Sequence, residues 1–158
     1  MTEINKDKIN KLITNDVKQF FNTPKMRKQS DDIEFGIKSE RDLLQPIRDK
    51  FNDNTITRTG NFDPFDFISE DKLFELKTRK FNYDTYPTTM IGMNKIKLCN
   101  QKDKEIYFIF KFTDKTLYCQ YNKDDFETFQ KKLGGRYDRG RSEISEYCYI
   151  PISYLTEF

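Results

Sequence analysis

The chain of 158 residues contains no histidine, no tryptophan and no alanine, and its only valine is Val17. The absence of histidine excludes mechanisms that need an imidazole, such as Ser-His-Asp hydrolysis and zinc chemistry on histidine ligands. The three cysteines, Cys99, Cys119 and Cys148, show no CxxC spacing and are too few for a zinc site. An odd number of cysteines favours a reducing compartment over a disulfide framework.

Long apolar runs are also missing. No stretch approaches the roughly 20 apolar residues that a membrane-spanning helix needs, and the first residues, MTEINKDKIN, lack the apolar core of a signal peptide. We therefore expect no membrane partner and an intracellular protein, in the cytoplasm or in the nucleus or viral factory of an infected cell, rather than a secreted one. The net charge of only +2 excludes a strongly basic DNA-binding tail but permits a local basic face.

Aromatic residues are plentiful, and they can form a hydrophobic core although the overall composition of the chain is polar. The mean hydropathy is −0.87 and charged residues make up 34% of the chain, but there are 15 phenylalanines and nine tyrosines. A chain of this length is typical of one domain with one core. The composition thus predicts a folded single domain.

The periodicity of apolar residues predicts an α/β fold. Two helices are expected over 3–21 and 32–51, separated by a polar loop over 23–31, and Pro46 predicts a kink or an early break in the second. Strands are expected over 55–59, 63–68, 72–79, 105–112, 116–121 and 146–152, with Pro151 favouring an edge position for the last. Further helices are expected over 88–100 and 124–133, with a Gly/Arg loop over 134–141. This order predicts a mixed β-sheet flanked by helices.

One charged residue interrupts the apolar stripe of the second predicted helix. The stripe comprises Ile33, Ile37, Leu44, Ile47 and Phe51, and its gap of seven residues holds Glu40 where an apolar residue is expected. A buried carboxylate costs several kcal/mol unless it is paired or coordinated. Glu40 is therefore either paired with a neighbouring Arg or Lys at the edge of the stripe, or part of a functional site.

The predicted hairpin over 63–79 places two carboxylates opposite each other. A two- or four-residue turn gives a register in which paired residue numbers sum to 141, so that Asp66 faces Glu75. Like charges that face each other in this way are destabilising. The simplest reason for the two carboxylates to lie there is that their oxygens bind a divalent cation. Lys77 lies on the same strand face as Glu75. A three-residue turn would remove the pairing, and a solvated Glu–Lys pair is the alternative interpretation.

These residues resemble the motif of the PD-(D/E)XK nuclease superfamily. The string FGIKSERDLLQPIRDKF is similar to the first helix of Holliday junction resolvases, and NFDPFDFISEDKLFELKTRK is similar to the catalytic hairpin. The resemblance covers about residues 32–80. Because Pro64 adjoins Asp63 rather than Asp66, Asp63 competes for the role of the motif aspartate. Asp66 is preferred because the hairpin register places it opposite Glu75.

The resemblance implies a restriction-endonuclease-like fold and Mg²⁺-dependent hydrolysis of DNA phosphodiester bonds, with Mn²⁺ as a substitute and no organic cofactor. Asp66 and Glu75 would hold the metal, with the Leu76 carbonyl as a further ligand. Lys77 would orient the attacking water and stabilise the developing negative charge. Glu40 would reach the metal through water or support a second ion.

The sequence after the hairpin is locally basic. Between Lys72 and Lys104 there are eight basic and three acidic residues, which is compatible with a groove that follows a phosphate backbone. The candidate DNA contacts are Arg79, Lys80, Lys95, Arg136, Arg139 and Arg141. A solvated helix face, and loop arginines paired with nearby acidic residues, are the alternatives for Lys95 and for the last three.

The chain is accordingly expected to be one nuclease domain. Residues 1–31 would form an N-terminal helix and loop, 32–80 the catalytic helix and hairpin, and 81–158 the remaining sheet and helices. The short chain leaves little room for a separate recognition domain, which favours a structure-selective homodimeric nuclease of recombination or repair. The alternatives are a sequence-specific restriction or homing endonuclease, a nucleic-acid-binding module of the same fold that does not cleave, and a purely structural protein.

Overall fold

The computed structural model describes residues 24–135 and 144–158 of the chain. The helix expected over 3–21 and the candidate DNA contacts Arg136, Arg139 and Arg141 lie outside these residues. The helices are α2 (Pro24–Phe51), α3 (Met93–Cys99), α4 (Lys123–Glu127) and the 3₁₀ turn η1 (Ile152–Tyr154). The strands are β1 (Thr57–Arg58), β2 (Phe67–Ile68), β3 (Lys72–Thr78), β4 (Thr88–Gly92), β5 (Glu105–Lys111), β6 (Thr116–Gln120), β7 (Gln130–Gly134), β8 (Ser145–Pro151) and β9 (Thr156–Glu157).

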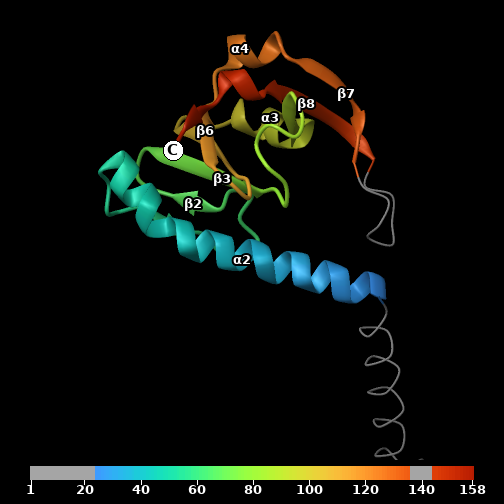
Figure 1. The fold of residues 1–158 in the computed structure, drawn as a ribbon. Helices are drawn as coiled ribbons and strands as arrows, with labels where there is room; N and C mark the ends of the chain where they lie inside the picture. Colours follow the sequence, from blue (N-terminus) through green and yellow to red (C-terminus); the bar gives the residue numbers. More distant parts are fainter. Residues whose placement is uncertain (1–23, 136–143) are drawn as a thin grey trace, which may run out of the picture.

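The strands form two sheets, and the larger one is mixed, as predicted. Its order is β1-β2-β3-β5-β6-β9, in which β3 and β5 run parallel and the other neighbours run antiparallel. A parallel pair needs a crossover connection, and the segment with β4 and α3 provides it. The smaller sheet has the antiparallel order β4-β8-β7. The long helix α2 lies along one side of the larger sheet, and α3 with the smaller sheet lies on the other (Figure 1).

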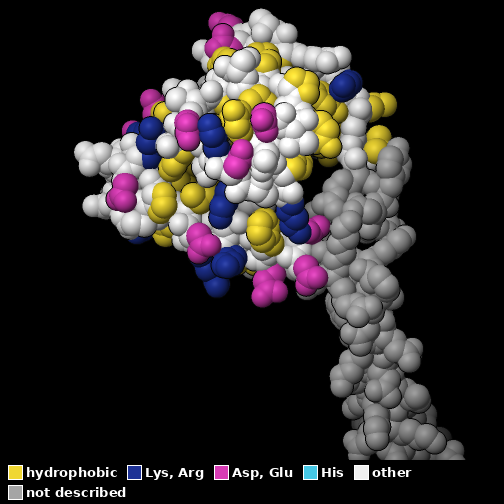
Figure 2. Space-filling model, viewed as in Figure 1, with side chains coloured by type: hydrophobic (Ala, Val, Ile, Leu, Met, Phe, Trp, Pro, Cys, Tyr) yellow, Lys and Arg dark blue, Asp and Glu magenta, His cyan; other side chains and the backbone are white. Residues whose placement is uncertain are grey.

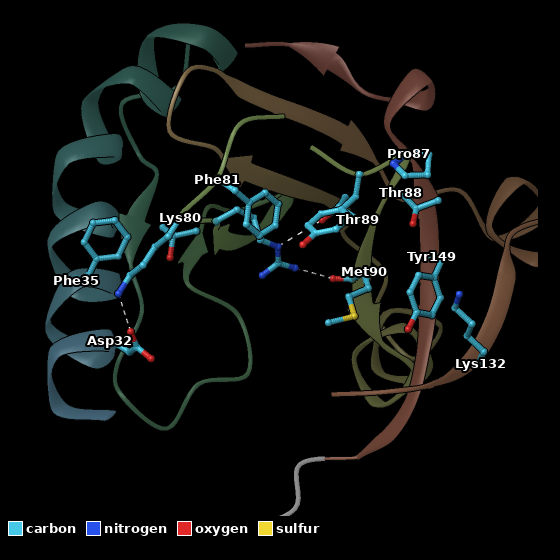
Figure 3. Close-up of a pocket in the computed structure, with 13 residues that line it drawn as sticks. Asp32, Phe35, Lys80, Phe81, Pro87, Thr88, Thr89, Met90, Lys132 and Tyr149 are labelled. Carbon is cyan, nitrogen blue, oxygen red and sulfur yellow. Dashed lines mark hydrogen bonds and ion pairs between the residues drawn. The ribbon is translucent and has the colours of Figure 1, made fainter. Parts of the chain in front are cut away.

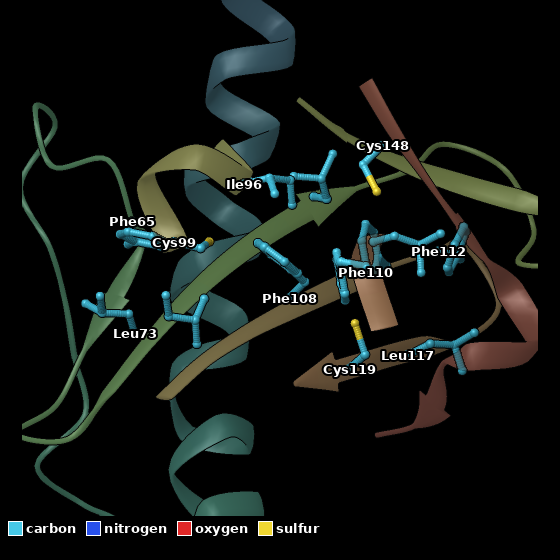
Figure 4. Packing of buried hydrophobic residues seen from close by; sticks show 14 residues of the cluster. Phe65, Leu73, Ile96, Cys99, Phe108, Phe110, Phe112, Leu117, Cys119 and Cys148 are labelled. Atoms are coloured by element: carbon cyan, nitrogen blue, oxygen red, sulfur yellow. The ribbon is translucent and has the colours of Figure 1, made fainter. Parts of the chain in front are cut away.

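The larger sheet is buried on both faces because β5 has apolar residues at nearly every position. Phe108 and Phe110 point into a cluster shared with α3 and the smaller sheet, part of which is seen in Figure 4. Tyr107 and Ile109 point into a second cluster under α2. Alternate side chains of a strand point to opposite faces, so the continuous apolar run in EIYFIFK fills two cores at once. A strand buried on both faces is typical of a parallel pair inside an α/β domain.

The second helix begins earlier and continues further than the sequence predicts. The loop expected over 23–31 is wrong from residue 24 onward, because α2 runs without interruption from Pro24 to Phe51. Its first residues, PKMRKQS, include good helix formers but few apolar residues, so they carry no apolar stripe. The early break at Pro46 is also absent, because the proline is exposed and water can hydrate the carbonyl that the ring leaves unpaired.

Two predicted helices are partly strands. The segment 88–100 divides into β4 and α3, and 124–133 divides into α4 and the start of β7. Both β4 and β7 pair with β8, which comes later in the chain. Their conformation therefore depends on a partner that local periodicity does not reveal. The strands expected over 55–59 and 63–68 shorten to β1 and β2, because the segment around Asp63 forms a tight turn in which its amide donates to the Gly60 carbonyl.

The edge position predicted for the last strand is wrong, because β8 is the central strand of its sheet. Pro151 pairs with Thr88 of β4, whereas β7 begins only at Gln130, which pairs with Tyr149. The proline therefore lies beyond the start of β7, where its missing N–H interrupts no ladder on that side. This position satisfies the rule that proline avoids the paired interior of a sheet.

Replacement of Phe108 by alanine should destabilise the fold strongly. Phe108 is 0% exposed in the first cluster, and removing such a ring costs about 3–5 kcal/mol. Phe62, which is fully exposed at 103%, is the matched control, and its replacement by alanine should change stability by less than about 0.5 kcal/mol. Urea unfolding followed by circular dichroism measures both values. Similar losses for the two variants would contradict the position of the core.

Candidate active site

The hairpin of β2 and β3 has the predicted register at two pairs of residues, but the predicted pairing of Asp66 with Glu75 is absent from the ladder. Phe67 pairs with Phe74 and Ile68 with Leu73, so the paired numbers sum to 141 as expected. At the next position, the ladder changes: the Asp66 amide donates to the Phe74 carbonyl at 2.9 Å. The Asp66 carboxylate accepts a hydrogen bond from the Leu76 amide at 2.7 Å. The two strands therefore separate at Asp66, and its carboxylate lies against the backbone of β3.

Glu75 is a charged residue in an apolar layer. Its side chain belongs to the same face of β3 as Leu73, which packs in the first cluster, whereas Phe74 and Leu76 pack in the second. Glu75 is only 4% exposed. Burial of an ionised carboxylate is costly unless opposite charges compensate it. The structure supplies such charges, from the same strand and from the crossover helix.

Two lysines contact the two oxygens of Glu75. Lys77 Nζ lies 2.8 Å from Oε1, and Lys95 Nζ lies 3.1 Å from Oε2. The second contact is an ion pair without hydrogen-bond alignment, so Oε2 accepts no hydrogen bond within residues 24–135 and 144–158. Lys77 is the more accessible of the two lysines, with 38% of its side chain exposed against 19% for Lys95. The pairing of Lys77 with Glu75 agrees with the strand face predicted for both.

Lys95 enters the site from α3 rather than extending into solvent. In addition to its contact with Glu75, its ammonium hydrogen-bonds the Pro64 carbonyl and lies 4.9 Å from the centre of the Phe65 ring. The sequence predicted a phosphate contact for Lys95, but it did not indicate a contact with Glu75. The order of the elements could have indicated this contact, because β3 is followed by a crossover helix that covers the strand face carrying Glu75.

The Asp66 carboxyl is strongly perturbed. Burial and the neighbouring Glu75 carboxylate raise the pKa of Asp66 to about 7, and Glu40 adds to the increase. The Leu76 amide and Lys77 act in the opposite direction, with smaller effect. A carboxyl that is hard to ionise beside two others gains much from a bound cation. Perturbation of this kind is concentrated at functional sites.

Glu40 reaches the same region from α2. It pairs with Arg58 of β1, with Nη2 3.0 Å from Oε2, so the pairing with a neighbouring arginine that the sequence left open is present. Glu40 and Asp66 also line one cavity of ≈ 320 Å³, together with the loop after β1. Asp63 lines this cavity too, but its carboxylate accepts the Phe65 amide at 3.0 Å and so shapes the loop.

The donor chemistry of this cluster fits a divalent cation. Mg²⁺ is typically held by one or two carboxylates, with water and substrate phosphate as the other ligands. Asp66 and Glu75 provide two carboxylates, and the unsatisfied Glu75 Oε2 provides an oxygen that lacks a hydrogen bond. No cluster of three or more Asp, Glu, Cys or His residues arranged around a metal position exists in the described part of the chain. A site here would therefore be a sparse one with two protein carboxylates.

Arg79 and Lys80 lie just beyond the end of β3. The Arg79 guanidinium donates to the Met90 carbonyl at 2.9 Å and to the Thr89 hydroxyl at 3.4 Å. Lys80 forms an ion pair of 2.7 Å with Asp32 of α2. Figure 2 shows basic and acidic side chains interspersed on the face it presents. On that face, the basic side chains form no single continuous patch.

The described helices include none that is both long and apolar enough to cross a membrane.

A search of curated proteins gives no match to the chain. A family model described as "Phage putative PDDEXK endonuclease" matches residues 54–158. The chain belongs to this family.

Membership of the PDDEXK endonuclease family agrees with the predicted superfamily and with the α/β fold. It also supports a nuclease activity, and nucleases of this superfamily generally use divalent metals. The match includes the whole hairpin with Asp66, Glu75 and Lys77, and it excludes Glu40, which lies before residue 54. The individual roles of these residues remain predictions.

The metal-free protein should lose stability as the pH rises toward 8. The pKa of Asp66 is about 7 in the folded chain against an ordinary value of 3.8, so the folded state binds the proton more tightly than the unfolded state. Stability from this proton is present below about pH 4 and is lost as the pH rises through 7. Asp66→Asn removes the titration. In EDTA, the free energy of unfolding of the wild type, relative to Asp66→Asn, should therefore fall between pH 5 and 8. Parallel profiles would contradict the environment assigned to Asp66.

Proposed function

We propose that the protein is a metal-dependent DNA endonuclease that hydrolyses phosphodiester bonds. The observation that carries the proposal is the convergence of Asp66, Glu75 and Lys77 at the point where β2 and β3 separate. Asp66 and Glu75 would hold Mg²⁺ or Mn²⁺, and the Leu76 carbonyl is a candidate further ligand. When bound, the cation supplies Lewis-acid polarisation of the scissile phosphate.

Lys77 is the residue best placed to act on the attacking water. Its ammonium is held by Glu75 Oε1 at 2.8 Å, yet more than a third of the side chain is exposed. It can therefore donate a hydrogen bond to a water at the surface while Glu75 keeps it in position. The same positive charge stabilises the negative charge that develops on the phosphate oxygens. Neither role needs a histidine.

Residues around the cluster are proposed to position the DNA. Lys95 neutralises the second oxygen of Glu75 and is a candidate phosphate contact. Arg79 and Lys80 continue β3 beyond Lys77 and offer positive charge to the strand on one side of the scissile bond. Arg58 holds Glu40 beside Asp66, from where Glu40 would act on the metal through water.

Lys77→Ala should lower DNA cleavage by at least about 10²-fold, a typical loss when one transition-state donor is removed. The assay uses linear, single-stranded, flapped and four-way DNA with Mg²⁺ and with Mn²⁺. Lys123→Ala is the matched control, because Lys123 is an exposed lysine of α4. Both variants should bind DNA with nearly wild-type affinity. Cleavage that survives Lys77→Ala, or that persists in EDTA, would refute the mechanism.

Measurements of Mn²⁺ binding should show whether Asp66 or Asp63 is the metal ligand. In isothermal titration calorimetry, Asp66→Asn and Glu75→Gln should each weaken Mn²⁺ binding by more than about 10-fold, since each removes a charged oxygen ligand. Asp63→Asn should have little effect, because Asp63 is engaged by the Phe65 amide. The reverse pattern would transfer the ligand role to Asp63. Absence of Mn²⁺ binding in the wild type would favour a binding module that does not cleave.

A further inference from the structure

A second cavity lies beside the hairpin of β2 and β3 and not within it. It has a volume of ≈ 770 Å³, within the range of about 300–1,000 Å³ that is typical of small-molecule sites. Its walls come from the N-terminal half of α2, from the segment after β3, and from the smaller sheet (Figure 3). Its lining includes Phe35, Arg79, Lys80, Tyr86, Lys132 and Tyr149.

Arg79 places a positive charge in this cavity without a carboxylate partner. Its guanidinium donates to the neutral oxygens of Met90 and Thr89, and the Phe110 ring lies 6.0 Å away. Over residues 24–135 and 144–158, it forms no ion pair with Asp or Glu. Burial lowers the pKa of Arg79, but an arginine stays protonated in proteins. A buried cation of this kind is stabilised by an anion, and the planar guanidinium suits a phosphate.

On opposite walls of the cavity, two aromatic rings each have a lysine ammonium group over them. Lys80 Nζ lies 5.1 Å from the centre of the Phe35 ring, and Lys132 Nζ lies 4.5 Å from the centre of the Tyr149 ring. Phe35 projects from α2 and Tyr149 from β8, and Thr89 and Met90, whose oxygens accept hydrogen bonds from Arg79, lie between them (Figure 3). Phe35 is 40% exposed. Aromatic rings flanked by cations are the combination that binds single-stranded nucleic acid, with bases stacked on the rings and phosphates on the charges.

The charge of the lining agrees with a polyanionic ligand. Three of the lining residues are cationic, Arg79, Lys80 and Lys132, and one is acidic, Asp32. Asp32 is paired with Lys80, which leaves the positive charge in excess. A neutral or cationic ligand would gain nothing from this excess. A ligand with an aromatic portion and a phosphate satisfies both the rings and the guanidinium.

We propose that this cavity receives an unpaired nucleotide of the DNA strand next to the scissile phosphate, a proposal that rests on the proposed nuclease function. Arg79 follows Lys77 by two residues, directly after the end of β3, and at ~3.3 Å per residue the two lie about 7 Å apart, so the cavity adjoins the proposed catalytic lysine. A base inside a duplex is covered by its neighbours and cannot stack on a ring in a cavity. The substrate must therefore present a single-stranded, flapped or extruded nucleotide at this position.

The experiment compares two strands of equal charge. Fluorescence anisotropy in EDTA measures the affinity of the full chain for a 12-nucleotide oligothymidylate and for an abasic strand of the same length. The wild type should bind the base-bearing strand about 5- to 100-fold more tightly, in line with stacking of one base. Phe35→Ala and Tyr149→Ala should each reduce this preference and leave abasic binding unchanged. Phe62→Ala, which removes an exposed ring outside the cavity, should retain the preference.

Equal wild-type affinities for the two strands would overturn the proposal, and so would equal losses for both strands in the two variants. If Tyr149→Ala lowers the melting temperature, this variant is not used. The test then rests on Phe35→Ala and on an assay of the wild type with 2-aminopurine in the strand. Stacking should quench the fluorescence of 2-aminopurine, and unchanged fluorescence would contradict the proposal. Because the assay needs no cleavage, base preference without cutting would refute only the nuclease function. Cutting without base preference would refute only the cavity.

Discussion

The site depends on one carboxylate that is buried among apolar side chains. Glu75 lies in the middle of β3, flanked in the chain by Phe74 and Leu76, and only 4% of it is exposed. Such a charge is tolerated because Lys77 and Lys95 contact its two oxygens from two different elements. The pairing fixes the position of both ammonium groups and ties the crossover helix to the hairpin. Burial, and next the charge of Glu75, raise the pKa of the neighbouring Asp66 carboxyl.

The arrangement of the layers leaves a cavity beside Asp66, the acidic neighbour of this buried carboxylate. The larger sheet is covered on one face by α2 and on the other by α3 with the smaller sheet. Where β2 leaves β3 at Asp66, the hairpin ceases to be a closed ladder, and the cavity shared by Glu40 and Asp66 opens. The second, larger cavity lies at the C-terminal end of β3, where Thr78 and Arg79 line it. The proposed chemistry and the proposed positioning of substrate thus involve β3 and the residues that directly follow it.

Much of the site could be predicted because it lies in a short hairpin. The register follows from turn length, and the shared face of Glu75 and Lys77 follows from the period of a strand. Glu40 was identified as a charge in an apolar stripe, although its partner Arg58 was not. Lys95 was noticed only as a basic residue, because its contact with Glu75 requires the crossover to fold back. The strands β4 and β7 were missed for the same reason, since both pair with the distant β8.

Local sequence is sufficient for the hairpin, for β5 and for the nuclease motif, because turn length and two-residue alternation act between neighbours in the chain. It is not sufficient for the surroundings of these elements. Arg79 lacks a carboxylate partner among the described residues, and Phe35 and Tyr149 line one cavity, only because α2, β3 and β8 meet in space. Contacts between segments more than a hundred residues apart produce no periodic pattern in the sequence. They form only when the layers pack and apolar surface is removed from water.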